Sequence, residues 1–202
     1  MQKKLIIIWL ITLSILVVVF ILFWVQNGGT DERYQHDADI VRLNHLTELA
    51  TYIEEYKDKT GEYPFVSGSE IPSYTYIASA NQMKYINEKP PYEHTEHDVN
   101  ELITILEDVL GKEIDMPFDP QKSPVNKPNF YIYMTHENYY VLAIHLHNEF
   151  SFSQKIAPHY NKLQVSNIPN QEFGVWNYNS LIKNDDFNMA INEELYKKGY
   201  FK

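Results

Sequence analysis

The residues best suited to chemistry are the imidazoles and carboxylates of the segment Glu93-His94-Thr95-Glu96-His97-Asp98. The two histidines can face one metal ion if a helical turn holds them. The segment matches no zinc-protease motif, and acids with neutral histidines at a helix start also suit capping and the helix dipole. The sequence therefore favours the start of a helix here, with a metal site at His94 and His97 as the alternative.

A second histidine pair, His145 and His147, alternates onto one face of a predicted strand, which is a geometry that a metal ion could use. No carboxylate is fixed nearby in the sequence, so a solvated or interface face is favoured. His36, Asp37 and Asp39 lie where a helix begins, and we interpret them as its polar face. We predict no metal ligands, although the pattern leaves open whether either histidine pair binds metal.

The residue types that nucleophilic catalysis requires are poorly represented. The chain has no cysteine, no Gly-x-Ser-x-Gly motif, and no glycine-rich phosphate loop after a predicted strand. We therefore predict that the protein is not an enzyme, with no catalytic residue and no cofactor.

The charge balance limits the class of partner. The 202 residues include 17 basic and 27 acidic side chains, a formal net charge of −10. Nucleic-acid binding requires clustered Lys and Arg, and the longest basic clusters here are two lysine pairs, at 3–4 and 197–198. The composition therefore excludes nucleic acid and favours protein partners, especially basic ones.

An uncharged apolar run extends from Leu5 to Val25. Its 21 residues, at ~1.5 Å each, are long enough to cross the roughly 30 Å hydrocarbon core of a bilayer. Lys3 and Lys4 precede the run and favour a cytoplasmic N-terminus. We therefore predict a single-pass protein of the bacterial inner membrane, with residues 1–26 as cytoplasmic tip and transmembrane anchor, and a periplasmic C-terminal domain. A cleaved signal peptide is the alternative.

Three helices are predicted after this run. Gly28-Gly29 interrupt the helical pattern, so residues 27–36 are expected to form a linker and the start of the next helix. The first helix spans 37–59 and ends at Gly61, because one stripe of apolar residues recurs at spacings of three or four. The second is capped by Asp98 and ends at Gly111, and the third runs from 185 to 198.

The predicted strands are fewer. Residues 65–92 are expected to be mainly irregular, with a short strand at 74–77, and a turn rich in proline follows at 116–120. Residues 130–134 and 139–147 predict a hairpin. Its second strand is expected to bury one set of alternating side chains: Tyr140, Leu142, Ile144 and Leu146. Phe173, Trp176 and Tyr178 of the C-terminal region are expected to complete the core, with a partner interface as the alternative.

The order of these parts resembles the type IV pilin and type II secretion pseudopilin superfamily. The resemblance is carried by Gly61, Tyr63 and Pro64 after a helix, by Pro117-Phe118-Asp119-Pro120, and by the tyrosine-rich hairpin. It implies an α+β fold in which an N-terminal transmembrane helix is followed by an amphipathic helix packed on a small antiparallel sheet, with additional helices. Residues 37–147 would form this pilin-like domain, and residues 148–202 a C-terminal extension packed on it.

Several family features have no counterpart in this sequence. A basic leader, a processed glycine and a glutamate five residues into the mature helix are not matched between Lys4 and Gln26, and no calcium-binding loop is evident in residues 148–184. We therefore expect a protein-binding module that resembles a pseudopilin and is accessory to a secretion or pilus machine. We expect its protein partners to be pseudopilins. We also expect residues 5–25 to contact the lipid bilayer. The alternative is a membrane-anchored immunity protein that neutralises a basic, periplasm-acting toxin.

Overall fold

The computed structural model describes residues 2–66, 71–77, 93–115, 131–158, 160–168 and 175–192. The chain divides into two compact units, Met1–His36 and Asp37–Lys202. Helix α1 (Gln2–Thr60) contributes to both units as a continuous helix of 59 residues. The prediction of a break at Gly28-Gly29 is therefore wrong. Helical hydrogen bonds need only the backbone, and glycine costs a helix only about 1 kcal/mol relative to alanine.

The predicted membrane anchor is not supported by this structure. In the described part of the chain, no helix is both long enough and apolar enough to cross a membrane. Residues 5–25 are part of helix α1, which continues without a break to Thr60. This finding contradicts the predicted transmembrane helix and the single-pass inner-membrane localisation with a periplasmic domain.

The second unit is built on a sheet that is larger than predicted. The described residues form seven strands in the order β2-β1-β3-β4-β6-β5, with β7 also paired to β6. The pairs β1–β2 and β6–β7 are parallel and the others antiparallel, so the expected small antiparallel sheet is instead a mixed one. The strands are β1 (Ser73–Ile77), β2 (Thr95–His97), β3 (Tyr131–His136), β4 (Tyr139–Leu146), β5 (Gln154–Ala157), β6 (Tyr160–Ser166) and β7 (Val175–Asn177).

The hairpin β3–β4 confirms the prediction for this segment. Its register pairs Ile132 with Ala143 and His136 with Tyr139. The side chains expected to face the core are at most 1% exposed: Tyr140, Leu142, Ile144 and Leu146. The strand at 74–77 is likewise confirmed as part of β1.

Helix α3 (Val99–Leu110) confirms the predicted caps. The Asp98 carboxylate accepts a hydrogen bond from the backbone N–H of Asn100 at 2.6 Å, and Gly111 adopts a left-handed conformation with φ of 70°. Acceptance by an Asp side chain satisfies one of the unpaired N–H groups at a helix start. The apolar face of α3 is buried at Val99, Leu102, Ile103, Leu106 and Leu110.

The C-terminal region contains more regular structure than was predicted. Strands β5, β6 and β7 were missed, and two short helices follow, α4 (Tyr178–Leu181) and α5 (Asp185–Ile191). Trp176 and Tyr178 pack against the hydrophobic core, as expected. The predicted turn at 116–120, Phe173, and the continuation of the last helix beyond residue 192 lie outside the described residues.

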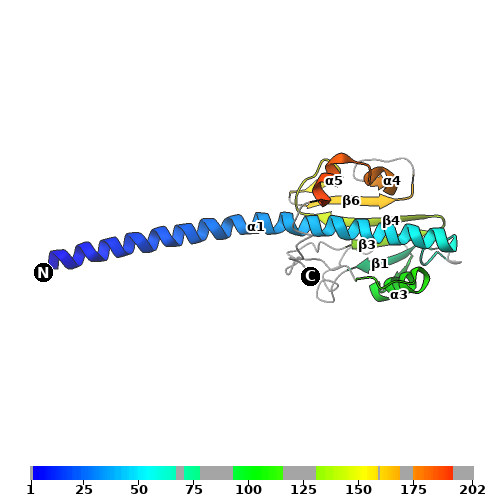
Figure 1. Ribbon diagram of the computed structural model, residues 1–202, viewed down its shortest axis with the longest axis horizontal. Coiled ribbons are helices and arrows are strands. Elements are labelled where there is room, and N and C mark those ends of the chain that lie inside the picture. Colours follow the sequence, from blue (N-terminus) through cyan, green and yellow to red (C-terminus); the bar gives the residue numbers. More distant parts are fainter. Residues whose placement is uncertain are drawn as a thin grey trace. The chain divides into compact units, whose positions relative to one another are not determined.

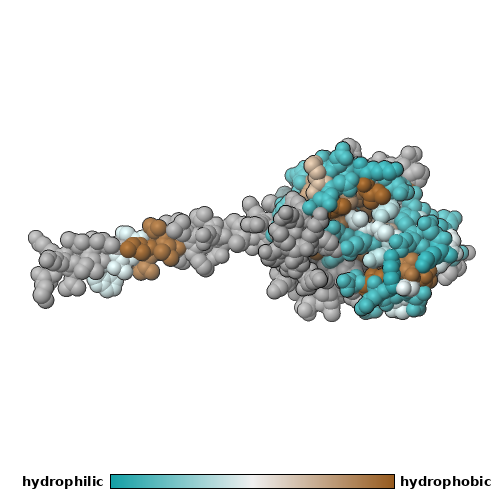
Figure 2. All heavy atoms as spheres, in the orientation of Figure 1, coloured by the Kyte–Doolittle hydropathy of each residue, from teal (hydrophilic) through white to brown (hydrophobic). Residues whose placement is uncertain are grey.

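The core of the second unit lies between one sheet face and the helices. Figure 1 shows the C-terminal part of α1 crossing the sheet, with α3 beside β1 and α4 and α5 beside β6. Buried apolar side chains come from the sheet and from these helices, including Leu46 of α1, Leu106 of α3, Leu163 of β6 and Phe187 of α5. The visible surface of this unit is mainly hydrophilic (Figure 2).

Candidate functional site

The structure does not bring His94 and His97 together. Residues 95–97 form strand β2 instead of a helical turn, and side chains three apart on an extended chain point to opposite faces. His94 packs edge-on against Tyr74, with ring centroids 5.2 Å apart. His97 stacks on Phe65 at 3.8 Å, and its Nδ1 lies 3.2 Å from a carboxylate oxygen of Glu101.

The two histidines of the second pair lie in different local structure. His145 lies in β4 and stacks on Tyr160, whose hydroxyl is 2.9 Å from its Nε2. His147 lies beyond the end of β4, in the turn that follows it. Within the described ranges, no group of three or more His, Asp or Glu side chains is arranged to hold a metal ion.

The buried carboxylate of Asp39 connects α1 to the segment that follows β4, and it also forms an ion pair within α1. Arg42 Nη1 donates to Asp39 Oδ1 at 2.6 Å, and the two side chains are 1% and 0% exposed. The Asp39 carboxylate also accepts from the backbone N–H of His147 at 3.0 Å and of Asn148 at 2.7 Å, and from the Asn148 side chain at 2.9 Å. Asp39, interpreted from the sequence as part of a polar helix face, is thus fully buried.

A second polar cluster contains the half-buried carboxylate of Glu54 and several buried tyrosines. Tyr140 of β4 donates its hydroxyl to Glu54 Oε1 at 2.9 Å, and the hydroxyl of Tyr63 lies 3.5 Å from Oε2. The rings of Tyr63 and Tyr140 are 4.9 Å apart, and Tyr133 donates to the carbonyl of Pro64 at 3.1 Å. The Gly-x-Tyr-Pro turn is thus held to α1 and β3 by hydroxyl groups and to β4 by ring packing.

Burial governs the protonation of this Glu54 cluster. Desolvation raises the pKa of Glu54, and the hydrogen bond from Tyr140 opposes that rise. Burial, followed by the nearby Glu54 charge, raises the pKa of Tyr63 to about 12 and also raises the pKa of Tyr140. Almost complete burial also raises the pKa of Tyr133. All three tyrosines of the cluster therefore remain neutral donors at physiological pH.

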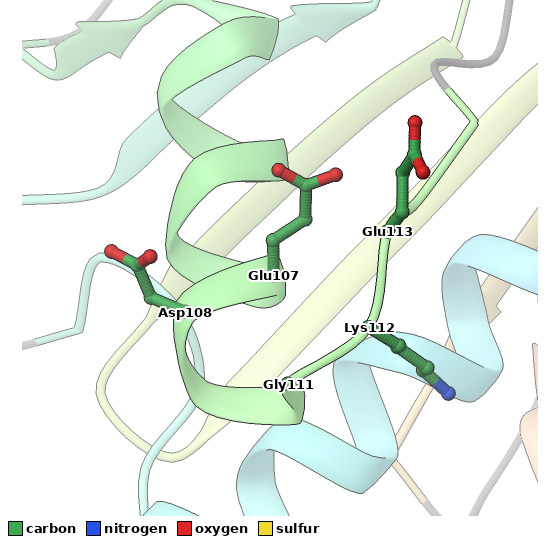
Figure 3. Close-up of a pocket in the computed structure, with 5 residues that line it drawn as sticks. All are labelled: Glu107, Asp108, Gly111, Lys112 and Glu113. Atoms are coloured by element: carbon green, nitrogen blue, oxygen red, sulfur yellow. The ribbon is translucent and has the colours of Figure 1, made fainter.

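An open pocket of about 330 Å³ lies where α3 ends. It is lined by Glu107, Asp108, Gly111, Lys112 and Glu113. Figure 3 shows Lys112 pointing toward α1, away from Glu107 and Glu113. Lys112 Nζ pairs with Glu55 at 2.6 Å and lies 4.4 Å from the ring centre of Tyr52. The three acids give the pocket a negative lining suited to basic side chains.

The first unit exposes apolar side chains along α1. In its described stretch, Trp9 is 72% exposed and the apolar residues between 13 and 19 are 50–60% exposed. Brown atoms mark this stretch in Figure 2. These apolar residues are Leu13, Ile15, Leu16, Val17, Val18 and Val19.

Comparison with known proteins provides no relative: no family model, curated protein or solved structure matches the chain. Neither the Asp39 cluster nor the Glu54 cluster was predicted from the sequence. The only local indication was the i,i+3 spacing of Asp39 and Arg42 on one helix. Function must therefore be argued from the geometry of the described residues.

Proposed function

We propose that the chain is a protein-binding module that resembles a pseudopilin and is accessory to a secretion or pilus machine. The observation that carries this proposal is the exposed apolar stretch of α1 in the unit Met1–His36. The well-formed second unit supports it, since a folded domain attached to an interacting helix can be held within a larger assembly.

The exposed stretch extends around the helix. Consecutive residues in an α-helix are about 100° apart, so Ile15 to Val19 reach every side of it. A helix that is apolar all round is stable only when other apolar surface covers it, and each such side chain gains about 1.5–3 kcal/mol on full burial. The proposed partner therefore packs on α1 with apolar helices of its own.

The test combines deletion with site-specific crosslinking. Deleting the gene should impair secretion or piliation, and a chain carrying L16K and V17K should fail to restore it. A photo-reactive residue at position 13 should crosslink to a pilin, a pseudopilin or another subunit of the machine. Met189→Lys is the matched control, because Met189 is a 67% exposed apolar residue of α5 in the second unit. Normal secretion and piliation in the deletion strain would contradict the proposal.

The negative surface favours a second candidate, the neutralisation of a basic toxin. The chain carries a net charge of −10, and the pocket at the end of α3 presents three carboxylates. A surface of one sign attracts a partner of the other sign and accelerates association at low salt. Toxin binding would then be strong at low ionic strength and would weaken as salt rises.

This alternative makes a separate genetic prediction. Deletion should leave secretion intact but make cells sensitive to toxin-producing siblings. Asp108→Lys with Glu113→Lys should fail to protect, whereas Glu149→Lys should protect normally, because Glu149 is an exposed acid outside the pocket. Unchanged survival of the deletion strain would reject toxin neutralisation.

A further inference from the structure

We propose that the turn after α1 is a strained latch: the ring of Phe65 holds the edge strand β2 on β1, and the turn and β2 open together as one unit. This inference concerns the conformation of the second unit and does not depend on the proposed function. Phe65 has a backbone conformation that bulky residues rarely adopt, and its ring contacts the last residue of β2.

The latch is built on a β-turn of the type that normally requires glycine. The backbone N–H of Val66 donates to the carbonyl of Tyr63 at 3.3 Å, which closes the turn around Pro64 and Phe65. The backbone of Phe65 has a φ of 65°. Proline at the second position and a positive φ at the third are the pattern of a type II turn, whose third residue is ordinarily glycine or asparagine. Phenylalanine at this position therefore carries the strain of the left-handed region.

The Phe65 ring offsets this strain through a parallel stack on the edge strand. It lies on the imidazole of His97, with the ring centroids 3.8 Å apart and the planes inclined by 5°. His97 is the last residue of β2, and its Nδ1 lies 3.2 Å from a carboxylate oxygen of Glu101 on α3, which helps to orient the imidazole. The stack thus connects the turn after α1 to β2 and, through Glu101, to α3.

A hydroxyl group of β1 makes the same connection beside the stack. Ser73 Oγ donates to the carbonyl of Phe65 at 3.3 Å and lies 2.7 Å from the hydroxyl of Thr95, the first residue of β2. Ser73 is only 3% exposed, so water has little access to replace either contact. Displacement of Phe65 would therefore also disturb the hydroxyl contact that holds Thr95.

Strand β2 has few other contacts that keep it on the sheet. It has three residues, all polar, at the edge of the sheet, and it pairs with β1 in parallel register. Parallel pairing is slightly less stable than antiparallel pairing, and a strand this short forms few ladder hydrogen bonds. It also contributes no apolar residue to the core. The stack on Phe65 is therefore a main contact of β2.

The strain makes this unit easier to open. In the closed state, the stack and the hydroxyl contacts favour β2 on the sheet, whereas the left-handed backbone of Phe65 opposes them. Opening lets Phe65 return to an ordinary conformation, so it costs less than the contacts alone would require. We expect the turn and β2 to open together at a lower free energy than global unfolding, which frees the backbone groups of β1 that pair with β2.

The experiment is amide hydrogen exchange by NMR on the full chain at constant pH. The Thr95 amide, which donates to the carbonyl of Pro72 at 2.9 Å, reports on β2, and the Val66 amide reports on the turn. Phe65→Ala removes the stack and keeps the strain. We expect it to lower the protection factors of both amides by the same factor, about 2- to 12-fold, which is the contribution of one aromatic pair.

Three further variants separate the stack from the strain. Phe65→Gly removes both, so its two reporter amides should be about 5-fold better protected than those of F65A. His97→Ala should reproduce F65A, whereas His97→Phe, which keeps a stacked ring, should retain the protection. Phe150→Ala is the matched control, because Phe150 is also half-buried and stacks on Phe152 at 5.0 Å, and it should leave both reporter amides unchanged.

Three results would overturn the proposal. Unchanged protection of Thr95 in F65A would show that the stack does not hold β2. Loss of Val66 protection alone would show that the turn and the strand open separately. Protection in F65G no higher than in F65A would show that the backbone of Phe65 carries no strain. Amides of β4 check that each variant is folded.

Discussion

Replacing Asp39 with asparagine should destabilise the second unit more than any surface substitution. The variant keeps the side-chain volume but removes the charge of the Asp39 carboxylate from Arg42, which is 1% exposed. Removing one member of a buried ion pair costs about 3–5 kcal/mol, because the remaining charge stays desolvated. The amide nitrogen of the substituted side chain could also face the backbone N–H of Asn148, which now donates to Asp39 at 2.7 Å. We therefore expect D39N to lower the free energy of unfolding by about 3–5 kcal/mol.

Urea unfolding of the full chain, followed by circular dichroism, measures this loss. Glu149→Gln is the matched control: Glu149 pairs with Lys155, both are more than half exposed, and such pairs contribute only about 0–1 kcal/mol. Arg42→Met should cost less than D39N, because Asp39 retains three N–H donors. The double variant should recover part of the D39N loss. A D39N loss no larger than that of E149Q would refute the reasoning.

Three further predictions concern other parts of the second unit. Burial lowers the pKa of His45 from 6.5 to about 4, so the fold favours neutral imidazole and loses up to about 3 kcal/mol as pH falls from 6.5 toward 4. The urea midpoint of His45→Gln should fall less over that window, and an identical decline would exclude His45. Gly111→Ala should cost about 1 kcal/mol by thermal unfolding, since φ is 70° and the added Cβ meets no atom within 4 Å; no change would exclude backbone strain. Phe187→Ala should cost about 3–5 kcal/mol, against almost nothing for Met189→Ala on the same helix, and equal losses would contradict the packing of α5.

The sequence correctly predicts an element where the segment itself contains the residues that begin and end it. Asp98 and Gly111 delimit α3 because a side-chain acceptor and a left-handed residue satisfy its unpaired backbone groups within the segment itself. The β3–β4 hairpin was predictable for a similar reason. Its two strands are adjacent in sequence, and β4 alternates between buried and half-exposed positions except at Ala143, which is also buried.

Patterns failed where polar residues occupy core positions or where the segment is short. The buried positions of strand β6 alternate as expected for a strand. One of them is occupied by the polar residue Asn161, which donates to the carbonyl of His147. This residue interrupts the apolar pattern that Leu163 and Val165 would otherwise form. Strand β2 has only three residues, all polar, and is held by pairing with β1. A single-sequence pattern contains no information about such pairing.

The contacts of the carboxylates of Asp39 and Glu54 on α1 were unpredictable because their partners are distant in sequence. Asp39 bonds to residues 108 and 109 positions away, and Glu54 to Tyr140, 86 positions away. On a helical wheel both look like ordinary solvated acids. Only the tertiary fold supplies the hydroxyl and amide donors that compensate these carboxylates for lost contact with water.

The positions of these carboxylates nevertheless follow a simple geometric rule once the fold is known. Asp39 and Glu54 are 15 residues apart, which is about 22 Å along a helix, and Tyr140 and His147 are 7 residues apart, which is about 24 Å along a strand. Asp39 near the start of the packed part of α1 binds just beyond the end of β4, and Glu54 binds near the beginning of β4. The helix and the strand therefore run in opposite directions, joined at both ends by one acid each. Sliding α1 along β4 by even one residue would break both contacts together, so the pair of carboxylates fixes the register that apolar packing alone leaves less well determined.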